Sequence, residues 1–559
     1  MGHAVCNKLR QEVQSLKLPK YMLDLRSNDN GQVRIIKTQV AQGRNMVYAI
    51  LSYCWGRDPT ILEGSKTNSG NIKHRFAGFP LSELPQTIQD AADVTRALGL
   101  RYLFVDALCI QQDQGGRIIQ RNLDAMPEFY ARAALVLSAA CASHSEAGFL
   151  GPRDPLYRQY ELPIALRDGE NTVNDRIILI ERAFEKKREP IDMRIWTQLE
   201  DKNALCMFRF ETERVLWRCW ETSIADSDVG KLSPSSKSMS TSSFDGSMFT
   251  SMLPQTQADV PELHLANWLE EVIDYSARRG ESLNDKLVAF EWTAKHMALA
   301  MGWDSSQYKA GLWIKDMPRQ LLWCRDCHFE NDPGPGNSAS KALAPTWSWA
   351  SLQSPITWQD MNELDWNDYT LEVVECKVKL MSPSHPFKNV KGGQLAVRGY
   401  VREAFWNGRE IVEGTSHNKA DRTSHAFSRP GARNRTRSPL KTKAGVRYYG
   451  SRSPIGLDRQ VYYRRHPDAE LTVVPIEVVW DAPLPPAAQW VKCLEIRSGV
   501  KSVGHSYGII LSCDGRSMSK RLGFFKFQHR TRNVPGKRIL EEMDPNWLHQ
   551  KRRRYVCII

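Results

Sequence analysis

The chain has 559 residues, 42% of them apolar, so it is too long for one hydrophobic core and can bury at least two. Its net charge of +13 comes almost entirely from the segment Lys419–Arg465, which holds 13 Lys and Arg residues and two acids. No apolar run reaches the ~20 residues that a membrane-spanning helix needs, so we expect a soluble protein without a membrane anchor.

The distribution of cysteines and the N-terminal sequence indicate the cellular compartment of the protein. Twelve cysteines are spread over the chain without dense pairing, a pattern typical of reduced thiols and not of a disulfide framework. The segment MGHAVCNKLRQEV carries charges and Gln where a signal peptide needs an apolar stretch. We therefore expect a cytoplasmic protein, or a nuclear one if the basic segments act as an import signal.

Strand and helix signals alternate along the first part of the chain. Short β-like runs at 21–25 and 32–38 precede a strong strand at 48–53, which ends in the turn CWGRDP. A helix is predicted from Pro85 to Gly99, because apolar residues recur on one face and the ends carry proline and glycine at their usual positions. The run YLFVDALCI at 102–110 is predicted to be a buried strand.

A second helix is predicted from Ile119 to Ala133, kinked or interrupted at Pro127, and the strand-like run ALVLSAA follows it. This alternation predicts an α/β unit with a largely parallel sheet. Sites in such sheets form at the carboxyl ends of the strands, so we expect the turns after Tyr53 and Ile110 to lie together.

The rest of the chain differs in composition. Residues 233–251 are predicted to be a flexible insert rich in Ser, Met and Thr, and residues 268–299 to be helical. The basic segment 419–465 is predicted to be a disordered loop. Strands are expected on either side of it, at 369–379, 394–401, 471–479 and 507–512.

Several strings of residues follow one another in an order that a known family shares. YAILSYCWG is followed by LPQTIQDAADVTRALGLRYLFVDALCIQQD, then by MPEFYARA and LVLSAACASHSEAGF. Together they resemble the heterokaryon incompatibility (HET) domain of filamentous fungi nearly motif for motif. RIWTQLEDKNALCMFRFETERVLWRCWE is similar to the third block of that family, with Gln198-Leu199-Glu200 in place of the usual order. DYSARRGESLNDKLVAFEWTAKHMA, YKAGLWIKDMPRQLLW and PTWSWAS resemble sequences that commonly follow HET domains.

The resemblance covers residues 48–351 and implies a role in nonself recognition after cell fusion, in which the HET domain triggers programmed cell death. It implies a flavodoxin-like α/β fold similar to the Toll/interleukin-1 receptor (TIR) domain, followed here by a mixed α+β region. Some TIR domains cleave the glycosidic bond of NAD, so NAD is a candidate substrate and no cofactor is expected. The expected partners are a second copy of the HET domain and an unknown incompatibility protein.

The resulting division of the chain has seven parts. They are a lead-in (1–20), the HET domain (21–225, core motifs 48–200), the Ser/Met-rich insert (226–260), a helical extension (261–355), a β-rich region (356–418), the basic loop (419–465) and a β-rich C-terminal region (466–559).

Cleavage of the nicotinamide bond needs a carboxylate near the ribose and an aromatic or apolar slot for the base. Asp106, in the run 102–110, and Asp113, in the following turn, are the candidate catalytic acids. The candidate ligand-binding residues of the motifs are Ser52, Tyr53, Trp55, Gly56, Cys109 and Gln112. Trp55 offers a stacking surface, and Ser52, Gly56 and Gln112 offer groups for hydroxyls or phosphate. No metal site is expected.

An architectural interpretation of the same residues remains open, in which Asp106 holds a neighbouring loop and Trp55 belongs to the core. Family members often carry a Trp and a Glu early in the next helix, whereas GGRIIQRNLDAM has neither and Glu128 is the nearest Glu. Cys54 and Cys109 are interpreted as buried thiols, since no His lies in either motif. An inert, diverged HET protein is therefore an alternative to an active one.

Three further motifs have simpler explanations. Gly504-His505-Ser506-Tyr507-Gly508 fits a nucleophile elbow, but a strand and not a helix follows it. Cys324-Arg325-Asp326-Cys327-His328 fits half of a zinc site, but no second pair completes it. The basic segment 419–465 offers a nucleic-acid or anionic-surface contact as an alternative function, although such runs are more often solvated linkers.

Overall fold

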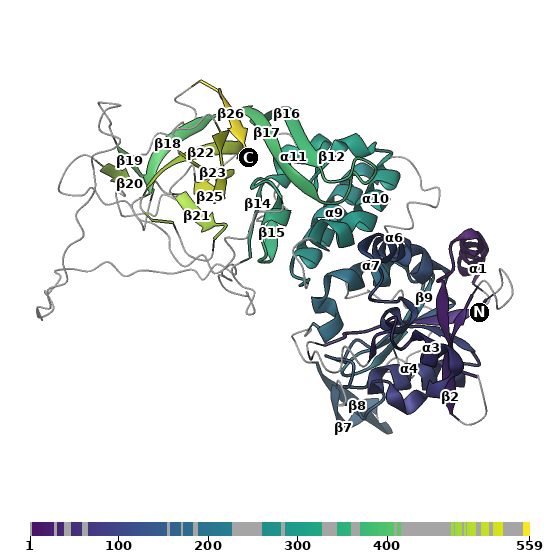
Figure 1. The fold of residues 1–559 in the computed structure, drawn as a ribbon. Helices are drawn as coiled ribbons and strands as arrows, with labels where there is room; N and C mark the ends of the chain where they lie inside the picture. Colours follow the sequence, from purple (N-terminus) through teal and green to yellow (C-terminus); the bar gives the residue numbers. More distant parts are fainter. Residues whose placement is uncertain are drawn as a thin grey trace, which may run out of the picture. The chain divides into compact units, whose positions relative to one another are not determined.

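The computed structural model of the chain is shown in Figure 1. It describes residues 3–26, 31–38, 46–56, 58, 65–153, 157–168, 171–182, 188–225, 260–280, 285–326, 344–358, 369–406, 411–414, 471–473, 476–482, 486–487, 489–498, 505–513, 518–528 and 552–559. Two compact units result: residues 1–264 with 278–303, and residues 265–277 with 304–559. The segments predicted to be a flexible insert (233–251) and a disordered basic loop (419–465) lie outside the described residues.

A nine-stranded sheet organises the first unit, in the order β11-β10-β9-β6-β3-β5-β1-β2-β4. Its strands are β1 (Tyr21–Asp24), β2 (Gln32–Lys37), β3 (Tyr48–Ser52), β4 (Phe79–Pro80), β5 (Tyr102–Phe104), β6 (Leu135–Ser138), β9 (Cys206–Phe210), β10 (Val215–Cys219) and β11 (Ser223–Ala225). Pairing is parallel at the centre, where β3 lies between β5 and β6 and β6 pairs with β9. The flanking pairs are antiparallel.

The prediction of a largely parallel sheet is therefore right for the centre and wrong for both edges. At one edge, β9 runs into β10 through a turn in which the Glu211 amide donates to the Arg214 carbonyl at 2.9 Å. So short a connection can join only antiparallel strands. All residues of β3 and β6 are buried, as expected for central parallel strands that are covered on both faces. The unit is thus a mixed α/β structure.

Helices cover the two faces of this sheet (Figure 1). α3 (Ile72–Ala77) and α4 (Gln86–Ala97) lie on one face, and α6 (Gly116–Arg132) and α7 (Ile195–Asn203) lie on the other. The helix predicted at 85–99 is confirmed as α4, with Pro85 at its N-cap and Gly99 at φ +77° behind it. α6 continues through Pro127, so the predicted interruption is wrong. Burial of Phe129 and Tyr130 stabilises its last turns against the lost hydrogen bond.

The run 102–110 differs from its prediction as one long strand. The strand β5 ends at Phe104, and residues Asp106–Cys109 form a single helical turn, α5. The amide of Cys109 donates to the Val105 carbonyl at 2.7 Å, and the Asp106 carboxylate accepts the Ala107 amide, also at 2.7 Å. The aspartate therefore turns the chain sharply at the end of the strand.

The remaining elements of the first unit are short or peripheral. They are α1 (Ala4–Glu12), η1 (Val13–Ser15), η2 (Leu81–Glu83), β7 (Tyr157–Asp168), β8 (Asn171–Arg182), η3 (Pro190–Met193) and α10 (Lys286–Met301). The single helical run predicted at 268–299 is two helices, α9 (Val260–Ser276) and α10; residues 265–276 of α9 belong to the second unit, and α10 belongs to the first. Between them Arg279 is extended: its amide donates to the Met193 carbonyl at 2.5 Å, and its carbonyl accepts the Ile195 amide at 3.1 Å.

The second unit is rich in β-structure after α9. Its elements are η6 (Ser305–Gln307), β12 (Tyr308–Lys309), β13 (Leu312–Trp313), η7 (Ile314–Asp316), α11 (Met317–Gln320), β14 (Trp323–Arg325), η8 (Trp349–Ser351), β15 (Ile356–Trp358), β16 (Glu372–Leu380), β17 (Val390–Gly399), β18 (Val401–Trp406), β19 (Ile411–Gly414), β20 (Leu471–Val473), β21 (Ile476–Trp480), β22 (Gln489–Arg497), β23 (His505–Ser512), β24 (Met518–Ser519), β25 (Arg521–Gln528) and β26 (Arg554–Ile558). The strands predicted at 369–379 and 507–512 are confirmed as β16 and β23. The predictions of single strands at 394–401 and 471–479 are wrong, since the first range spans the end of β17 and the start of β18, and the second contains β20 and most of β21, which lie at opposite edges of one sheet.

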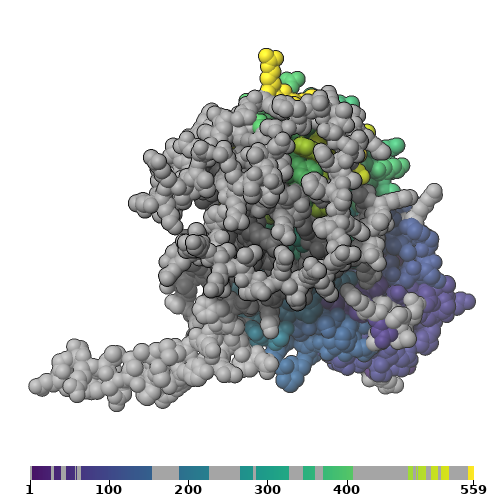
Figure 2. All heavy atoms as spheres, turned by 90° about the vertical axis from the view of Figure 1, so that its left-hand side faces the viewer, coloured from purple at the N-terminus to yellow at the C-terminus, as the bar shows by residue number. Residues whose placement is uncertain are grey.

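Two larger sheets are present among the described residues of this unit. One has the order β16-β17-β26-β24 and the other the order β20-β19-β18-β22-β23-β25-β21. Five tryptophans are fully buried, Trp268, Trp313, Trp323, Trp347 and Trp349. The C-terminal residues reach the surface where they are yellow in Figure 2, since residues 552–555 are exposed whereas 556–558 are buried. None of the described helices has the length and apolar composition of a membrane span.

Candidate functional site

The parallel strands bring polar side chains together at their carboxyl ends. Ser52 ends β3, Ser138 ends β6, and Asp106 lies two residues beyond the end of β5. The Trp55 indole nitrogen, in the turn after β3, donates to both carboxylate oxygens of Asp106 at 3.1 Å. The turns that follow β3 and β5 therefore meet. The sequence predicts such a meeting for the turn after Ile110, whereas the contact comes from Asp106, because β5 already ends at Phe104.

α7 adds a second carboxylate to this edge. Glu200 is buried and accepts a hydrogen bond from the Ser52 hydroxyl. Arg194, immediately before α7, donates from its guanidinium to the Tyr53 carbonyl. Tyr130, buried on α6, hydrogen-bonds to the Leu51 carbonyl at 3.4 Å. Segments around four elements thus contribute to one polar cluster: Ser52, Tyr53, Trp55, Asp106, Tyr130, Arg194 and Glu200. We call it the acid cluster.

Burial and charge oppose each other within the acid cluster. Burial raises the pKa of Glu200 above its ordinary value, while Arg194 and the hydrogen bond from Ser52 act to lower it. Burial likewise raises the pKa of Asp106, against Arg194, the Ala107 amide and the Trp55 indole. Burial raises the pKa of Tyr130 as well, and the nearby carboxylates of Glu200 and Asp106 raise it further. Two acids with raised pKa values beside one arginine form the kind of group that is frequent in functional sites.

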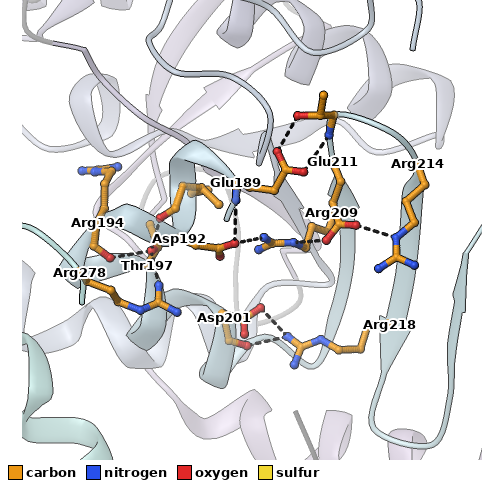
Figure 3. Close-up of polar contacts among 12 residues, drawn as sticks. Glu189, Asp192, Arg194, Thr197, Asp201, Arg209, Glu211, Arg214, Arg218 and Arg278 are labelled. Carbon is orange, nitrogen blue, oxygen red and sulfur yellow. Dashed lines mark hydrogen bonds and ion pairs between the residues drawn. The ribbon is translucent and has the colours of Figure 1, made fainter. Parts of the chain in front are cut away.

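An ion-pair network supports the segment that carries Arg194 (Figure 3). Arg209 on β9 donates to Asp192 at 2.7 Å and to Glu211 at 2.9 Å. Arg218 on β10 donates to the Asp201 carboxylate at 3.0 Å. The Thr197 hydroxyl donates to the Arg194 carbonyl at 2.8 Å and accepts from Arg278 at 3.0 Å. These contacts attach both ends of α7 to the sheet and so hold Glu200 beneath Ser52.

α7 also fills the crevice where an open sheet usually binds its ligand. The parallel strands lie side by side in the order β5-β3-β6-β9, which is 2-1-3-4 when they are numbered along the chain. The direction in which successive strands are added therefore reverses between β3 and β6. The cavity there has a volume of about 10 Å³, and Ser52, Ser138, Thr197 and Arg278 are among its lining residues. This volume suffices for about one water molecule. A larger hollow of about 210 Å³ lies near α3 and β4, lined by Asn71, His74, Arg75, Phe79, Glu83 and Leu84.

Comparison with known families decides the nature of this domain. Residues 48–200 match the model of the family described as heterokaryon incompatibility protein (HET). The chain carries a HET domain. Its function is accordingly of the heterokaryon incompatibility type. No curated protein and no solved structure matches the chain.

The nine-stranded sheet extends beyond the matched range of the HET domain. β9, which pairs with β6 in the parallel centre, begins after Glu200, and β1 and β2 precede residue 48. A fragment that ends at Glu200 would expose the edge of β6 and lose Arg209 and Arg218. The strands of the complete sheet occupy residues 21–225.

Some predicted residues of the HET domain lie outside the acid cluster. Asp113 is exposed, and its carboxylate accepts hydrogen bonds from the Ser69 amide at 2.8 Å and the Gln111 side chain at 2.9 Å. Hydrogen bonds from the Ser69 side chain and amide lower its pKa to about 2. Gln112 donates to the Ile110 carbonyl at 2.8 Å and to the Asp106 carbonyl at 3.3 Å, and so closes the helical turn α5.

The cysteines of the two HET motifs are buried thiols. Cys109 is 3% exposed, and burial raises its pKa to about 12. Cys54 packs with Ala140 and Ile191, and burial raises its pKa to about 11. Neither forms a thiolate near neutral pH, which agrees with their interpretation as small core residues.

Gly56 has a steric role in the HET turn. Its φ is +91°, and a Cβ at this position would lie 2.7 Å from the Cβ of His144. Gly56→Ala is therefore expected to destabilise the domain by about 2–4 kcal/mol, from backbone strain and displacement of the His144 loop. Thermal unfolding of the intact protein measures this loss. Gly115→Ala is a suitable comparison, since a Cβ at Gly115 would have no atom within 4 Å, and an equal effect of the two changes would contradict the steric argument.

Sequence reasoning missed the second acid and the arginine of the cluster. Glu200 was visible in the altered Gln198-Leu199-Glu200 run, but only the position of α7 in the tertiary structure places its carboxylate beside Ser52. Glu128, the nearest Glu in sequence, instead binds the N-terminal segment: its carboxylate accepts the Lys17 amide at 2.9 Å. The second acid of the cluster therefore comes from α7 and not from α6.

The structure also bears on two of the discounted motifs. Ser506 lies within the strand β23, fully buried, and donates to Glu495 at 2.8 Å, so it is no nucleophile elbow. Cys324 is buried on β14, whereas Cys327 and His328 lie outside the described residues.

Proposed function

We propose that this chain is a nonself-recognition protein whose HET domain triggers programmed cell death through self-association. The HET match supports the incompatibility role. The parallel order 2-1-3-4 is the beginning of the flavodoxin-like order 2-1-3-4-5, which supports the kinship with TIR domains. TIR-like domains of this kind signal by assembling with one another, and we extend that mode of action to this chain.

The filled crevice is the observation that favours association over catalysis. Ligand pockets for small molecules have volumes of roughly 300–1,000 Å³. The cavity at the strand reversal has about 10 Å³, because α7 and Glu200 occupy the space outside β3 and β6. A dinucleotide cannot enter while α7 is in place. The acid cluster then acts as a buried polar connection that holds the domain in one conformation.

NAD cleavage is the second candidate, and the acid cluster is the observation that favours it. Asp106 and Glu200 are two carboxylates with raised pKa values beside Arg194, and Trp55 offers an aromatic face next to them. A carboxylate at this edge would stabilise the oxocarbenium-like state of the ribose. This activity requires α7 to move away from Ser52, since Glu200 and Arg194 close the crevice.

Growth of a fungal host that expresses the full chain tests the proposal, with intracellular NAD assayed over the same hours. We expect cell death without loss of NAD. Asp106→Ala is expected to abolish killing, because it removes the acceptor of the Trp55 indole and disrupts the cluster. Asp113→Ala is the matched control: it removes an exposed acid from the same loop and should kill like the wild type.

Two outcomes would contradict association as the mode of action. Death with a loss of NAD that disappears in Asp106→Ala would establish the hydrolase instead. Normal growth with the full chain, in a host where a known incompatibility protein kills, would favour an inert, diverged member of the family. The alternative of a nucleic-acid contact through residues 419–465 concerns a segment outside the described residues and stays a hypothesis.

A further inference from the structure

The N-terminal helix and the edge of the sheet bring three metal-binding side chains to one point. His3 and Cys6 lie one helical turn apart, just before and in the first turn of α1, and Cys219 ends β10. The His3 Nδ1 atom is 3.4 Å from the Cys219 sulfur and 4.0 Å from the Cys6 sulfur. All three ligand atoms lie within 4.8 Å of one another. Both cysteines are buried, at 7% and 9% exposure.

These separations match the edges of a tetrahedral zinc site. With Zn–S bonds of about 2.3 Å and Zn–N bonds of about 2.0–2.1 Å, tetrahedral angles place nitrogen about 3.6 Å and a second sulfur about 3.8 Å from a sulfur ligand. The observed nitrogen–sulfur distances lie on either side of that value. An ion at the centre of the three atoms would need only small side-chain rotations to reach bonding distance from each of them.

The surroundings offer a candidate for the fourth ligand and support for the sulfurs. The Glu221 carboxylate, two residues after Cys219, is 3.8 Å from His3 Nδ1. Burial raises the pKa of the Cys6 thiol, and the backbone amides of Trp220 and Glu221 act against that rise. Amides directed at a sulfur ligand are typical second contacts of metal–thiolate sites, because they stabilise its negative charge. Two sulfurs, one imidazole and one carboxylate form a ligand set that suits zinc better than magnesium or calcium.

We propose that His3, Cys6 and Cys219 bind a zinc-class divalent cation, with Glu221 at the fourth position. Binding releases the two thiol protons and leaves the oxidation states of sulfur and metal unchanged. The ion joins α1 to the corner between β10 and β11. Further along the same helix, Arg10 donates to the Cys206 sulfur at 3.6 Å, on the strand next to β10. The site thus attaches the N-terminal helix to the edge of the HET sheet.

Metal binding by the full chain, purified with reduced thiols and without a histidine tag, tests this proposal. Cobalt(II) serves as a spectroscopic substitute for zinc. We expect about one Zn²⁺ per chain and, with Co²⁺, a sulfur-to-cobalt charge-transfer band of a tetrahedral site. Zinc should raise the melting temperature of the wild type by several degrees, and a chelator should reverse the rise.

Variants separate this site from other thiols of the chain. His3→Ala and Cys219→Ser should lose the band and the zinc-dependent rise in melting temperature. Cys141→Ser replaces a half-buried thiol elsewhere in the same unit and should keep both. Cys327→Ser, in the Cys-x-x-Cys-His motif, should also keep both. His3→Ala removes a partly exposed side chain at the start of a helix, so the fold is expected to survive it.

Three results would overturn the assignment. The first is a reduced wild type that binds neither ion, and the second is a band that persists in both His3→Ala and Cys219→Ser. Loss of the band in Cys327→Ser alone would place the metal at the other motif. If mass spectrometry of the protein before reduction shows a Cys6–Cys219 disulfide and reduction does not create metal binding, the pair is a cross-link and the proposal is wrong.

Discussion

Glu200→Ala is expected to lower the free energy of unfolding of the intact protein by about 3–5 kcal/mol, because it removes a buried, hydrogen-bonded carboxyl group and leaves its partners unsatisfied. Glu200 is 5% exposed, accepts the Ser52 hydroxyl and faces the positive charge of Arg194. Its removal leaves the buried Ser52 hydroxyl without its acceptor and the partly buried Arg194 without a nearby negative charge, and it leaves a cavity beneath β3. Urea unfolding followed by circular dichroism measures the loss.

The control for this substitution is Glu128→Ala. Glu128 pairs with Lys17, whose side chain is 72% exposed, and such surface pairs contribute about 0–1 kcal/mol. We therefore expect Glu128→Ala to unfold close to the wild type. Equal losses for Glu200→Ala and Glu128→Ala would show that the acid cluster does not stabilise the HET domain.

The variant Glu200→Gln tests the charge of residue 200, because the free energy of unfolding of the wild type and of the variant should depend differently on pH. Burial raises the pKa of Glu200 above 4.5, so the folded protein keeps a proton that the unfolded chain has released. The contribution of this group is therefore most favourable below pH 4.5 and decreases as the pH rises toward the raised pKa. Glutamine does not titrate, so its contribution does not decrease in this way. The free energy of unfolding of Glu200→Gln should therefore rise relative to that of the wild type as the pH increases between the ordinary and the raised pKa of Glu200. A difference that does not change with pH would contradict the raised pKa.

Arg521→Ala is expected to have a comparably large effect on the second unit, about 3–5 kcal/mol. The Arg521 side chain on β25 is fully buried, and it donates to the Asp481 carboxylate at 3.0 Å and to the Leu321 carbonyl at 2.6 Å. It also donates to the Trp323 carbonyl and lies 3.3 Å from the centre of the Trp323 ring. One guanidinium therefore connects three chain segments that are distant in sequence.

The loss in Arg521→Ala follows from the groups that remain. Asp481 becomes a buried carboxylate without its cation, and burial already raises its pKa above the ordinary value. Two buried carbonyls lose their donor, at about 1–3 kcal/mol for each unsatisfied group. Tryptophan fluorescence is a suitable measurement, because Trp323 lies under the guanidinium. Arg521→Lys keeps the charge but not the planar fork, and we expect it to recover only part of the loss.

Arg398→Ala is the matched control in the same unit. Its side chain is 55% exposed and faces Glu372 at 3.8 Å, so the expected change is within about 1 kcal/mol. If Arg521→Ala unfolds no more easily than Arg398→Ala, the buried guanidinium does not organise this unit.

The match between prediction and structure depends on the range of the interactions involved. The helix α4 could be read from its own residues, because its apolar face, the proline at its start and Gly99 at its end are local features. The meeting of Trp55 and Asp106 could also be inferred, since parallel strands joined by helices place their carboxyl ends at one edge. The end of β5 at Phe104 could not, because the apolar run 102–110 has no signal that separates a strand from a buried turn.

Other features depend on contacts between distant residues. Asp106 and Asp113 looked alike in sequence, but the first joins the acid cluster and the second is an exposed acid bound by Ser69. The antiparallel edges of the sheet are formed by hairpins. The alternation of apolar and polar residues indicates a strand but does not identify the strand with which it pairs. Cys219 lies more than two hundred positions after His3 and Cys6, and the three side chains approach only when α1 packs on β10.

By itself the sequence determined that this protein has an α/β HET domain, where its central strands and α4 lie, and that Trp55 follows β3 in a turn. These features depend on motif order and on local patterns of apolar residues. Only the tertiary structure decided that Glu200 and Arg194 complete the acid cluster, that α7 closes the crevice, and that three potential metal ligands meet at the sheet edge. The physical reason is that burial, charge pairing and ligand geometry depend on distances across the fold, and spacing along the chain does not determine those distances.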